Sequence, residues 1–244
     1  INTASANTGI GYFALNGNTS GYGNTGIGNL ALRLNSTGIW NTAIGGAAQW
    51  GNTTGSSNVA LGYQALRNNS VGSGNVAIGR DAMLQNTDAT GENVVIGAFA
   101  LNSSTVGSYN VMIGTRAGFQ NVNGSNNVFI GNQAGFNETG SNKLYISNSQ
   151  TNPPLIYGDF SQSRIGLGTI NPAFPLHIVT NIYPGIQIDG SDPNWSGYYV
   201  NATNAGASPF YGYKVGNMVK AYHYSNGGGD WFLNNKGLTI FAVL

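Results

Sequence analysis

The sequence predicts an all-β fold, in which a β-solenoid of about 17-residue coils is followed by a small β-rich domain. A five-residue word recurs eight times in the first half of the chain: Asn, Thr or Val, a small or apolar residue, Ile or Leu, then Gly. Successive copies are 17 residues apart, except for one interval of 18. A fixed period of this kind is typical of solenoids, whose repeats stack as coils. The last 65 residues are instead dense in aromatic residues.

Each repeat combines a strand-forming word with turn-forming residues. Seven residues after every Asn there is an Ala, and Gly, Ser, Asn and Thr fill the stretches between the words. Such residues form turns, because Gly accepts positive φ and Asn or Ser bonds the local backbone. We expect a strand of about five residues, a bend, a second short strand and a turn in each unit. The eight copies begin at Asn7, Asn24, Asn41, Asn58, Asn75, Asn93, Asn110 and Asn127, with a weaker ninth at Asn142.

The composition of the repeat excludes a helical coil. Gly costs roughly 1 kcal/mol against Ala inside a helix, and every unit carries Gly beside Thr, Val and Asn. Stacked coils pair each strand with its copies and bury continuous rows of Val or Thr and Ile or Leu. Alternation along the strand puts Val76 and Ile78 on one face and Ala77 on the other.

A coil of this girth buries little apolar surface alone, so the sequence predicts a partner. The face that holds Ala77 grows more apolar along the chain, through Val95, Met112 and Phe129. We expect this growing face to meet a second copy of the chain around a symmetry axis. Arg80 and Asp81 do not recur in the repeat, so we expect them to be exposed turn residues rather than an active-site loop.

The repeats resemble known families of surface fibres. The units "NVAIGRDAM" and "NVALGYQAL", with the linker "NTTGSS", resemble the head repeats of trimeric autotransporter adhesins. The stretch "NTTGSSNVALGYQAL" is also similar to phage-tail and bacterial-surface fibres that carry an endosialidase-type chaperone at their C-terminus. Mosaic trimeric fibres of predatory bacteria share the layout, with a recognition tip at the C-terminal end.

A second element supports the resemblance to chaperone-bearing fibres. The stretch "RIGLGTINPAFPLHIV", from Arg164 to Val179, is similar to the "GIGT..P...LHV" element that follows the repeats there. Together the two matches cover residues 1 to about 180. The sequence ends at Leu244 without the chaperone segment of those fibres, so we expect that this segment has been removed by cleavage or that the sequence stops short of it. The resemblance implies a left-handed parallel β-roll wound as a homotrimer, located extracellularly, at a cell surface or in a virion tail. Because the chain starts at Ile1 inside a repeat-like segment, we expect a fragment or a processed form.

Composition excludes several classes of function. The chain has 244 residues, 38 Gly, no Cys, 7% charged residues and a formal net charge of +1. This gives no basic patch for nucleic acid, and no apolar run reaches the 18 or more residues of a spanning helix, so no membrane insertion is expected. Without Cys there is no disulfide, Cys-ligated zinc or thiol nucleophile. We expect no metal and no cofactor.

Composition also divides the chain into three parts. Residues 1–150 form the predicted β-roll, which ends where Pro153 and Pro154 interrupt the strand ladder. Residues 151–180 form a connector, in which His177 lies in an apolar strand and is expected to be packed or hydrogen-bonded rather than catalytic. Residues 181–244 form the aromatic tip domain, whose words such as "FYGYKVG" and "KAYHYS" predict antiparallel strands.

The tip domain is the predicted binding site. Strand alternation prevents all of its aromatic residues from pointing inward, and exposed rings beside polar groups suit a carbohydrate. We therefore expect a trimeric adhesin that attaches to a cell surface through glycan. The alternatives are a phage tail fibre for host recognition and a passive spacer without a ligand. The expected glycan-binding residues are Asp192, Asn194, Trp195, Tyr199, Tyr222, His223, Tyr224, Asp230 and Trp231.

An enzyme is the less favoured interpretation. Asp189, Asp192 and Asp230 could supply the paired carboxylates of a glycosidase, but nothing in their spacing supports such a pair. The sequence holds no nucleophile motif, no metal-ligand cluster and no phosphate-binding loop. We therefore expect no catalytic residue.

Overall fold

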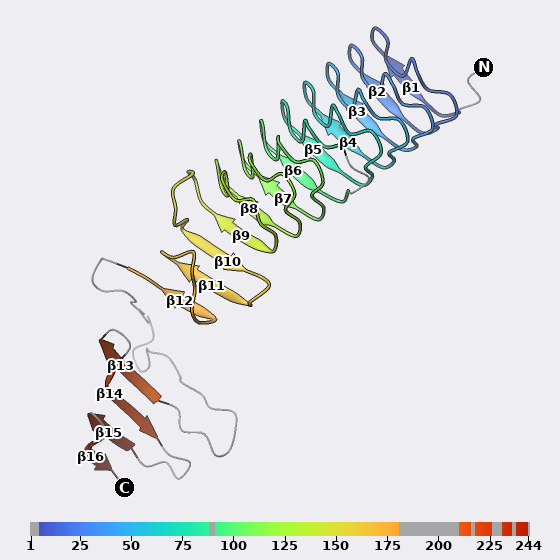
Figure 1. Cartoon of the computed structure of the whole chain (residues 1–244). Coiled ribbons are helices and arrows are strands. Elements are labelled where there is room, and N and C mark those ends of the chain that lie inside the picture. The colour runs from blue at the N-terminus through green and yellow to red at the C-terminus, as the bar shows by residue number, and fades with distance from the viewer. Residues whose placement is uncertain are drawn as a thin grey trace, which may run out of the picture. The chain divides into compact units, whose positions relative to one another are not determined.

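The computed structural model describes residues 5–87 and 91–180, together with strands at 210–215, 218–225, 231–235 and 238–243. The chain divides into two compact units, Ile1–Gly185 and Ile186–Leu244. The regular elements of the described residues are all strands, which confirms the all-β prediction. In the first unit, successive coils stack along one axis, from the blue coil of β1 to the yellow strand β9 (Figure 1).

One short strand per coil builds a parallel ladder in chain order, β1 to β9, which confirms the predicted solenoid. Each strand pairs with its copy in the next coil without a register shift, as in Val59 against Val76 and Ile78 against Ile96. The 18-residue interval is thus absorbed outside the ladder. The strands are β1 (Thr8–Ile10), β2 (Thr25–Ile27), β3 (Thr42–Ile44), β4 (Val59–Leu61), β5 (Val76–Ile78), β6 (Val94–Ile96), β7 (Val111–Ile113), β8 (Val128–Ile130) and β9 (Lys143–Ile146).

The prediction of a five-residue strand and a second strand in each unit is wrong. Strands β1 to β8 have three residues each, and a turn segment follows each of them in place of the second strand. Within that segment, the residues six and eight positions after Asn have a left-handed backbone, for example Leu30 (φ 62°) and Leu32 (φ 50°). L-residues such as Leu seldom adopt this conformation. Coil-to-coil bonds offset the strain: Leu30 N–H donates to Tyr12 O at 2.8 Å, and Leu32 N–H to Ala48 O at 3.1 Å.

The recurrent Gly after each strand is required by the close approach of the coils. At Gly62 φ is +132°, and a Cβ would lie 2.7 Å from the carbonyl oxygen of Gly79 in the next coil. Gly45 repeats this arrangement with Gly62 below it, at 2.5 Å. A side chain at this position would therefore force the stacked backbones apart.

The structure reverses the predicted roles of the two strand faces. Ala77, Val95, Met112 and Phe129 are fully buried inside the coils of the single chain, so they are not the predicted partner surface. The first and third residues of each strand, which were expected to be buried, point outward. Successive strand residues point to opposite faces, so burial of the middle residue inside the coil leaves the first and third residues on the outside.

The interior keeps its volume by exchanging sizes between two positions. In the coils of β2 to β5 the middle strand residue is Gly or Ala, and the residue eight positions after Asn is larger, such as Leu66 or Met83. In the coils of β7 and β8 the middle residues are Met112 and Phe129, and the opposite position becomes Gly. A Cβ on Gly118 would lie 2.8 Å from Met112 Sδ. The core is therefore close-packed along its length, although its residues change.

A series of stacked asparagines runs along the same interior, from coil to coil. Each Asn that opens a repeat accepts, through Oδ1, the backbone N–H of the next such Asn, in an unbroken series from Asn7 to Asn127. The carboxamide Nδ2 of Asn58 also donates to Asn41 Oδ1 at 3.1 Å and to Gly72 O at 2.9 Å. We call this series the asparagine ladder. A second, shorter series joins Asn35 to its neighbours above and below, at 2.7 and 2.6 Å.

Antiparallel pairing closes the roll at its C-terminal end. Strand β10 (Ile156–Asp159) pairs antiparallel with β9 and with β11 (Arg164–Leu167), and β12 (Leu176–Ile178) pairs parallel with β11. The second unit contains a four-stranded antiparallel sheet, described here by itself. Its strands are β13 (Phe210–Val215), β14 (Met218–Ser225), β15 (Trp231–Asn235) and β16 (Leu238–Val243).

We predict that Asn58→Ala destabilises the roll. The change removes the acceptor of the Asn75 N–H, 2.9 Å away, and the donor to Gly72 O. Leaving these buried groups unsatisfied is expected to lower the free energy of unfolding by about 2–3 kcal/mol. Urea unfolding followed by circular dichroism measures the loss. Asn132→Ala, at an exposed asparagine, is the control, and equal stability of the two variants would contradict the role of the ladder.

Candidate functional site

The outward side of the β-ladder presents a continuous apolar surface. We call the first and third residues of β1 to β8 the apolar strand face. Its first column is Thr in β1 to β3 and Val from β4 on, and its third column is Ile or Leu throughout. Val59 is 37% exposed, Leu61 42% and Ile113 38% in the single chain. Because the face holds no charged residue, its chemistry suits contact with another apolar surface.

The predicted glycan-binding residues fall into two groups. Asp192, Asn194, Trp195, Tyr199 and Asp230 lie outside the described residues. The other four lie in the sheet of the second unit, with three consecutive residues in β14 and one at the start of β15.

The strand register divides this second group between two faces of the sheet. Tyr222 and Tyr224 are two residues apart in β14, so they share a face, and His223 lies on the opposite one. Ser225 shares the face of His223, and Trp231 is its cross-strand partner. Tyr222 and Tyr224 are therefore candidates for one surface, and His223 and Trp231 for the other. The assignment of all nine residues to glycan binding stays a prediction.

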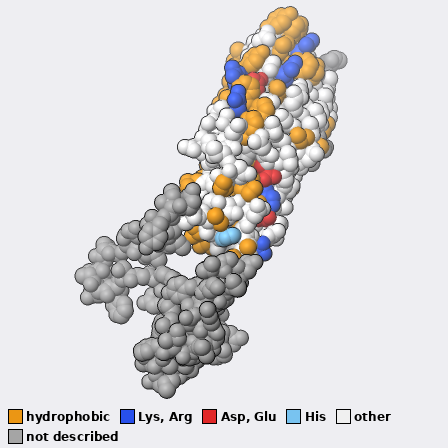
Figure 2. All heavy atoms as spheres, turned by 60° about the vertical axis from the view of Figure 1, so that its left-hand side comes forward, with side chains coloured by type: hydrophobic (Ala, Val, Ile, Leu, Met, Phe, Trp, Pro, Cys, Tyr) orange, Lys and Arg blue, Asp and Glu red, His pale blue; other side chains and the backbone are white. Residues whose placement is uncertain are grey.

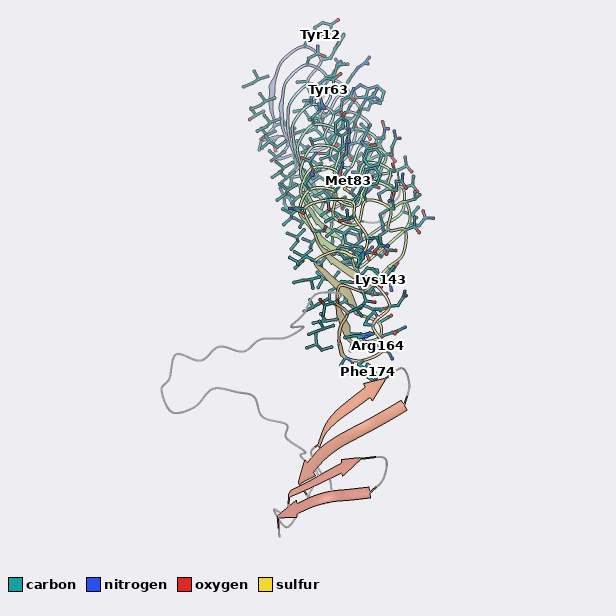
Figure 3. The ribbon with its side chains drawn as sticks, turned by 90° about the vertical axis from the view of Figure 1, so that its left-hand side faces the viewer. Tyr12, Tyr63, Met83, Lys143, Arg164 and Phe174 are labelled. Carbon is teal, nitrogen blue, oxygen red and sulfur yellow. The ribbon has the colours of Figure 1, made fainter. Side chains whose placement is uncertain are left out.

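A charged cluster joins the last strand of the ladder to the closing strand. Lys143 Nζ in β9 lies 2.8 Å from Asp159 Oδ2 in β10. The other carboxylate oxygen, Asp159 Oδ1, accepts the backbone N–H groups of Ser161 at 3.0 Å and Gln162 at 3.2 Å. Lys143 lies at the C-terminal end of the roll, near Arg164 (Figure 3). The cluster thus fastens β10 to β9.

The pKa values of the cluster fit a structural role. The hydrogen bond from Lys143, supported by Ser161, lowers the pKa of Asp159 from 3.8 to about 2. Burial is the largest single influence on Lys143 and lowers its pKa, but hydrogen bonds and charge interactions with Asp159 and Tyr157 together outweigh burial, so the net shift of the pKa is upward. Burial and the hydrogen bond to Glu138 raise the pKa of Tyr145. Each shift stabilises the protonation state found near neutral pH, so none of the three is poised to exchange a proton there.

Two smaller predictions can be compared with the geometry. His177 Nδ1 accepts the backbone N–H of Ala173 at 3.1 Å, which confirms that this histidine is hydrogen-bonded. Arg80 is exposed as predicted, but the side chain of Asp81 is only 14% exposed and lies 3.7 Å from Arg80 Nε. The prediction for Asp81 is wrong, because its carboxylate is largely covered and lies beside the guanidinium of Arg80.

A hollow on the side of the roll was not anticipated from the sequence. It has a volume of about 230 Å³, and its lining includes Arg33, Trp50, Tyr63 and Arg67. The available signal was positional, since Arg33, Trp50 and Arg67 all stand nine residues after a repeat Asn. Residues at one repeat position lie above one another on the surface of the roll, even where their types differ between coils. The hollow could therefore have been predicted by comparing the coils position by position.

Comparisons with other proteins add no assignment. The chain matches no known family and no curated protein. No group of three or more His, Cys, Asp or Glu within the described ranges could hold a metal ion. The described residues also include no helix long and apolar enough to cross a bilayer.

We predict that acid weakens the closed end of the roll. Since the pKa of Asp159 is lower in the folded chain than its ordinary value of 3.8, its ionised form stabilises the fold. This stabilisation is complete above about pH 4 and is lost as the pH falls towards about 2. Thermal unfolding between about pH 5 and about pH 2 should show a smaller decrease in Tm for Asp159→Asn than for the unchanged chain. Glu92→Gln, at an exposed carboxylate, is the control, and identical pH profiles of all three proteins would contradict the prediction.

Proposed function

We propose that the chain is part of a homotrimeric, extracellular attachment fibre, with the β-roll as shaft and the second unit as the glycan-binding part. The apolar strand face is the observation that carries this proposal. Proteins that remain monomeric rarely expose contiguous apolar patches larger than a few hundred Å². The face here continues over eight coils, or about 40 Å at the usual strand spacing.

The chemistry of this face favours copies of the same chain as its partners. It offers no charge to attract an oppositely charged protein, and its columns are straight because the strands pair without register shifts. A straight column can pack along its whole length against identical columns around an axis parallel to the roll. The number three comes from the resemblance to trimeric fibres.

Glycan binding by the second unit is supported by its aromatic residues. Tyr222 and Tyr224 share one face of the sheet, and His223 and Trp231 share the other. An aromatic ring covers the apolar C–H face of a sugar, while neighbouring polar groups bond its hydroxyls. Three copies in one fibre would raise the avidity, so each site can be weak. We propose no catalytic role. A phage tail fibre would use the same surfaces, whereas a passive spacer would bind no glycan.

We predict that the chain has three times the 25.4 kDa mass of one copy when measured by light scattering. Ile113→Lys should lower this mass, because it places an ammonium group in the third column of the apolar strand face, in β7. Val122→Lys is the matched control, since Val122 is equally exposed, at 38%, but lies outside the strand face. A mass of one chain for the unchanged protein would contradict the proposed trimer.

We predict that the full chain binds glycans on an array, and that one face of the second sheet carries the binding. Two double variants separate the faces: Tyr222→Ala with Tyr224→Ala, and His223→Ala with Trp231→Ala. The proposal expects one pair to abolish binding while the other preserves it, with unchanged circular dichroism spectra. If a folded trimer of the unchanged chain binds no glycan, the second unit is a spacer.

A further inference from the structure

The hollow on the roll exists because one coil has small residues where its neighbours have large ones. The coil of β3 carries Gly46 and Ala47 at the two positions after the recurrent Gly. The coil before it has Asn29 and Leu30 there, and the coil after it has Tyr63 and Gln64; all six residues line the hollow. The missing side chain leaves free space between two retained ones, whose backbones are two coil spacings, or about 10 Å, apart. This spacing and the volume of about 230 Å³ suit one sugar ring.

Two arginines give the hollow its charge. Arg33 and Arg67 line it from the coils on either side of Trp50. The guanidinium carbon of Arg67 lies 5.2 Å from the ring centroid of Trp50. That stacking positions the guanidinium, yet Arg67 Nε is buried and has no hydrogen-bond partner in the described structure. A buried donor of this kind calls for an acceptor.

Among the described residues, no carboxylate forms an ion pair with these arginines. The lining of the hollow contains no Asp or Glu, and no acidic residue precedes Asp81 in the sequence. The ion pairs of the described residues join Arg80 to Asp81 and Lys143 to Asp159, so they involve neither arginine. Figure 2 shows blue basic side chains among orange hydrophobic ones at the N-terminal end of the roll.

Aromatic walls indicate what kind of anion the hollow would take. Trp50 and the exposed Tyr63 contribute ring surface beside the two arginines, and Tyr63 lies near the N-terminal end of the roll (Figure 3). An inorganic anion would use the arginines alone. A sugar acid would use both, since its ring has apolar C–H faces and its carboxylate matches the guanidinium fork. We propose that this hollow binds a hexuronic acid residue of an acidic polysaccharide.

This proposal is independent of the function proposed above. The site lies within the coils of β2 to β4 and uses no residue of the second unit. It also needs no contact between copies of the chain, so a monomer that binds a sugar acid would support it while contradicting the trimer.

Binding to the full chain can be measured by isothermal titration calorimetry with a trisaccharide of galacturonic acid. The neutral galactose trisaccharide and sodium sulfate are the comparison ligands. We expect the acidic trisaccharide to bind and the other two to bind at least about tenfold more weakly, because each lacks either the carboxylate or the sugar ring. Salt should weaken the binding.

Matched variants test whether the hollow is the site. Gly46→Tyr fills the hollow with the residue that the next coil carries at the same position, Tyr63. A Cβ on Gly46 would lie 3.3 Å from the ring of Tyr63, and that exposed ring has room to shift. Ala98→Tyr makes the same substitution at the equivalent position of the coil of β6 and is the control. Arg67→Gln removes one guanidinium, and Arg116→Gln, at an exposed arginine, is its control. Circular dichroism confirms that each variant is folded.

We expect Gly46→Tyr and Arg67→Gln each to weaken binding of the acidic trisaccharide by about tenfold or more, and both controls to leave it unchanged. Three results would overturn the proposal. They are no binding by the unchanged chain at millimolar trisaccharide, equal binding of the neutral trisaccharide, and binding that persists in folded Gly46→Tyr.

Discussion

The roll depends on the hydrogen bonds of the asparagine ladder, in which a side-chain carboxamide lies at the same position of successive coils. In the asparagine ladder, the side-chain oxygen of each Asn accepts the backbone N–H of the next Asn, so these interior N–H groups are satisfied. Since each Asn bonds the next one along the axis, the bonds form only when identical positions lie above one another. The ladder therefore fixes the register as well as the stability. Other residues that recur in each repeat, such as the Gly after each strand and the buried Ala, allow the same close stacking of the coils.

The narrow interior then determines which surface remains apolar. One row of strand side chains and one row from the turn segment fill the coil, and the two rows exchange volume, as Met83 gives way to Gly118 while Ala77 gives way to Met112. No room is left for the flanking Val and Ile columns. The third column is Ile or Leu through all eight coils, and the first column is Val in β4 to β8. The partner surface that we propose would account for these exposed apolar residues. The same constraint that makes the shaft thin thus supports its assembly with further copies.

The period predicted the architecture but not the orientation of its parts. Fixed spacing establishes stacked parallel strands, because only that arrangement places each Asn on its copy. Alternation in Val76, Ala77 and Ile78 separates two strand faces but does not show which of them lies inside the coil. The increase in side-chain size from Ala77 to Phe129 suggested that this face meets a partner, whereas it forms the interior. The sequence also shows the loss of side-chain volume at Gly118 and Gly135, which compensates for the larger Met112 and Phe129. This loss can be interpreted only once those glycines are known to face the strand. Left-handed Leu and Gln residues could not be predicted, since coil-to-coil bonds override their local preference. In the second unit, pairing between strands determined which predicted residues share a face.

Stacking also explains how so regular a shaft can carry specific sites. A residue that recurs in every coil is required by the fold, so specificity has to come from positions that vary. Each varying position becomes a column on the surface, with neighbours set one coil apart. A pair of small residues such as Gly46 and Ala47, placed between pairs of larger ones, opens a hollow. Two arginines on either side of an aromatic ring, in a second column, supply that hollow with positive charge and an apolar surface. Because the asparagine ladder and the glycines hold the backbone, such columns can change without cost to the stack. Recognition by the shaft therefore does not compete with its role as a spacer, and the two proposed binding sites of the chain can be altered independently.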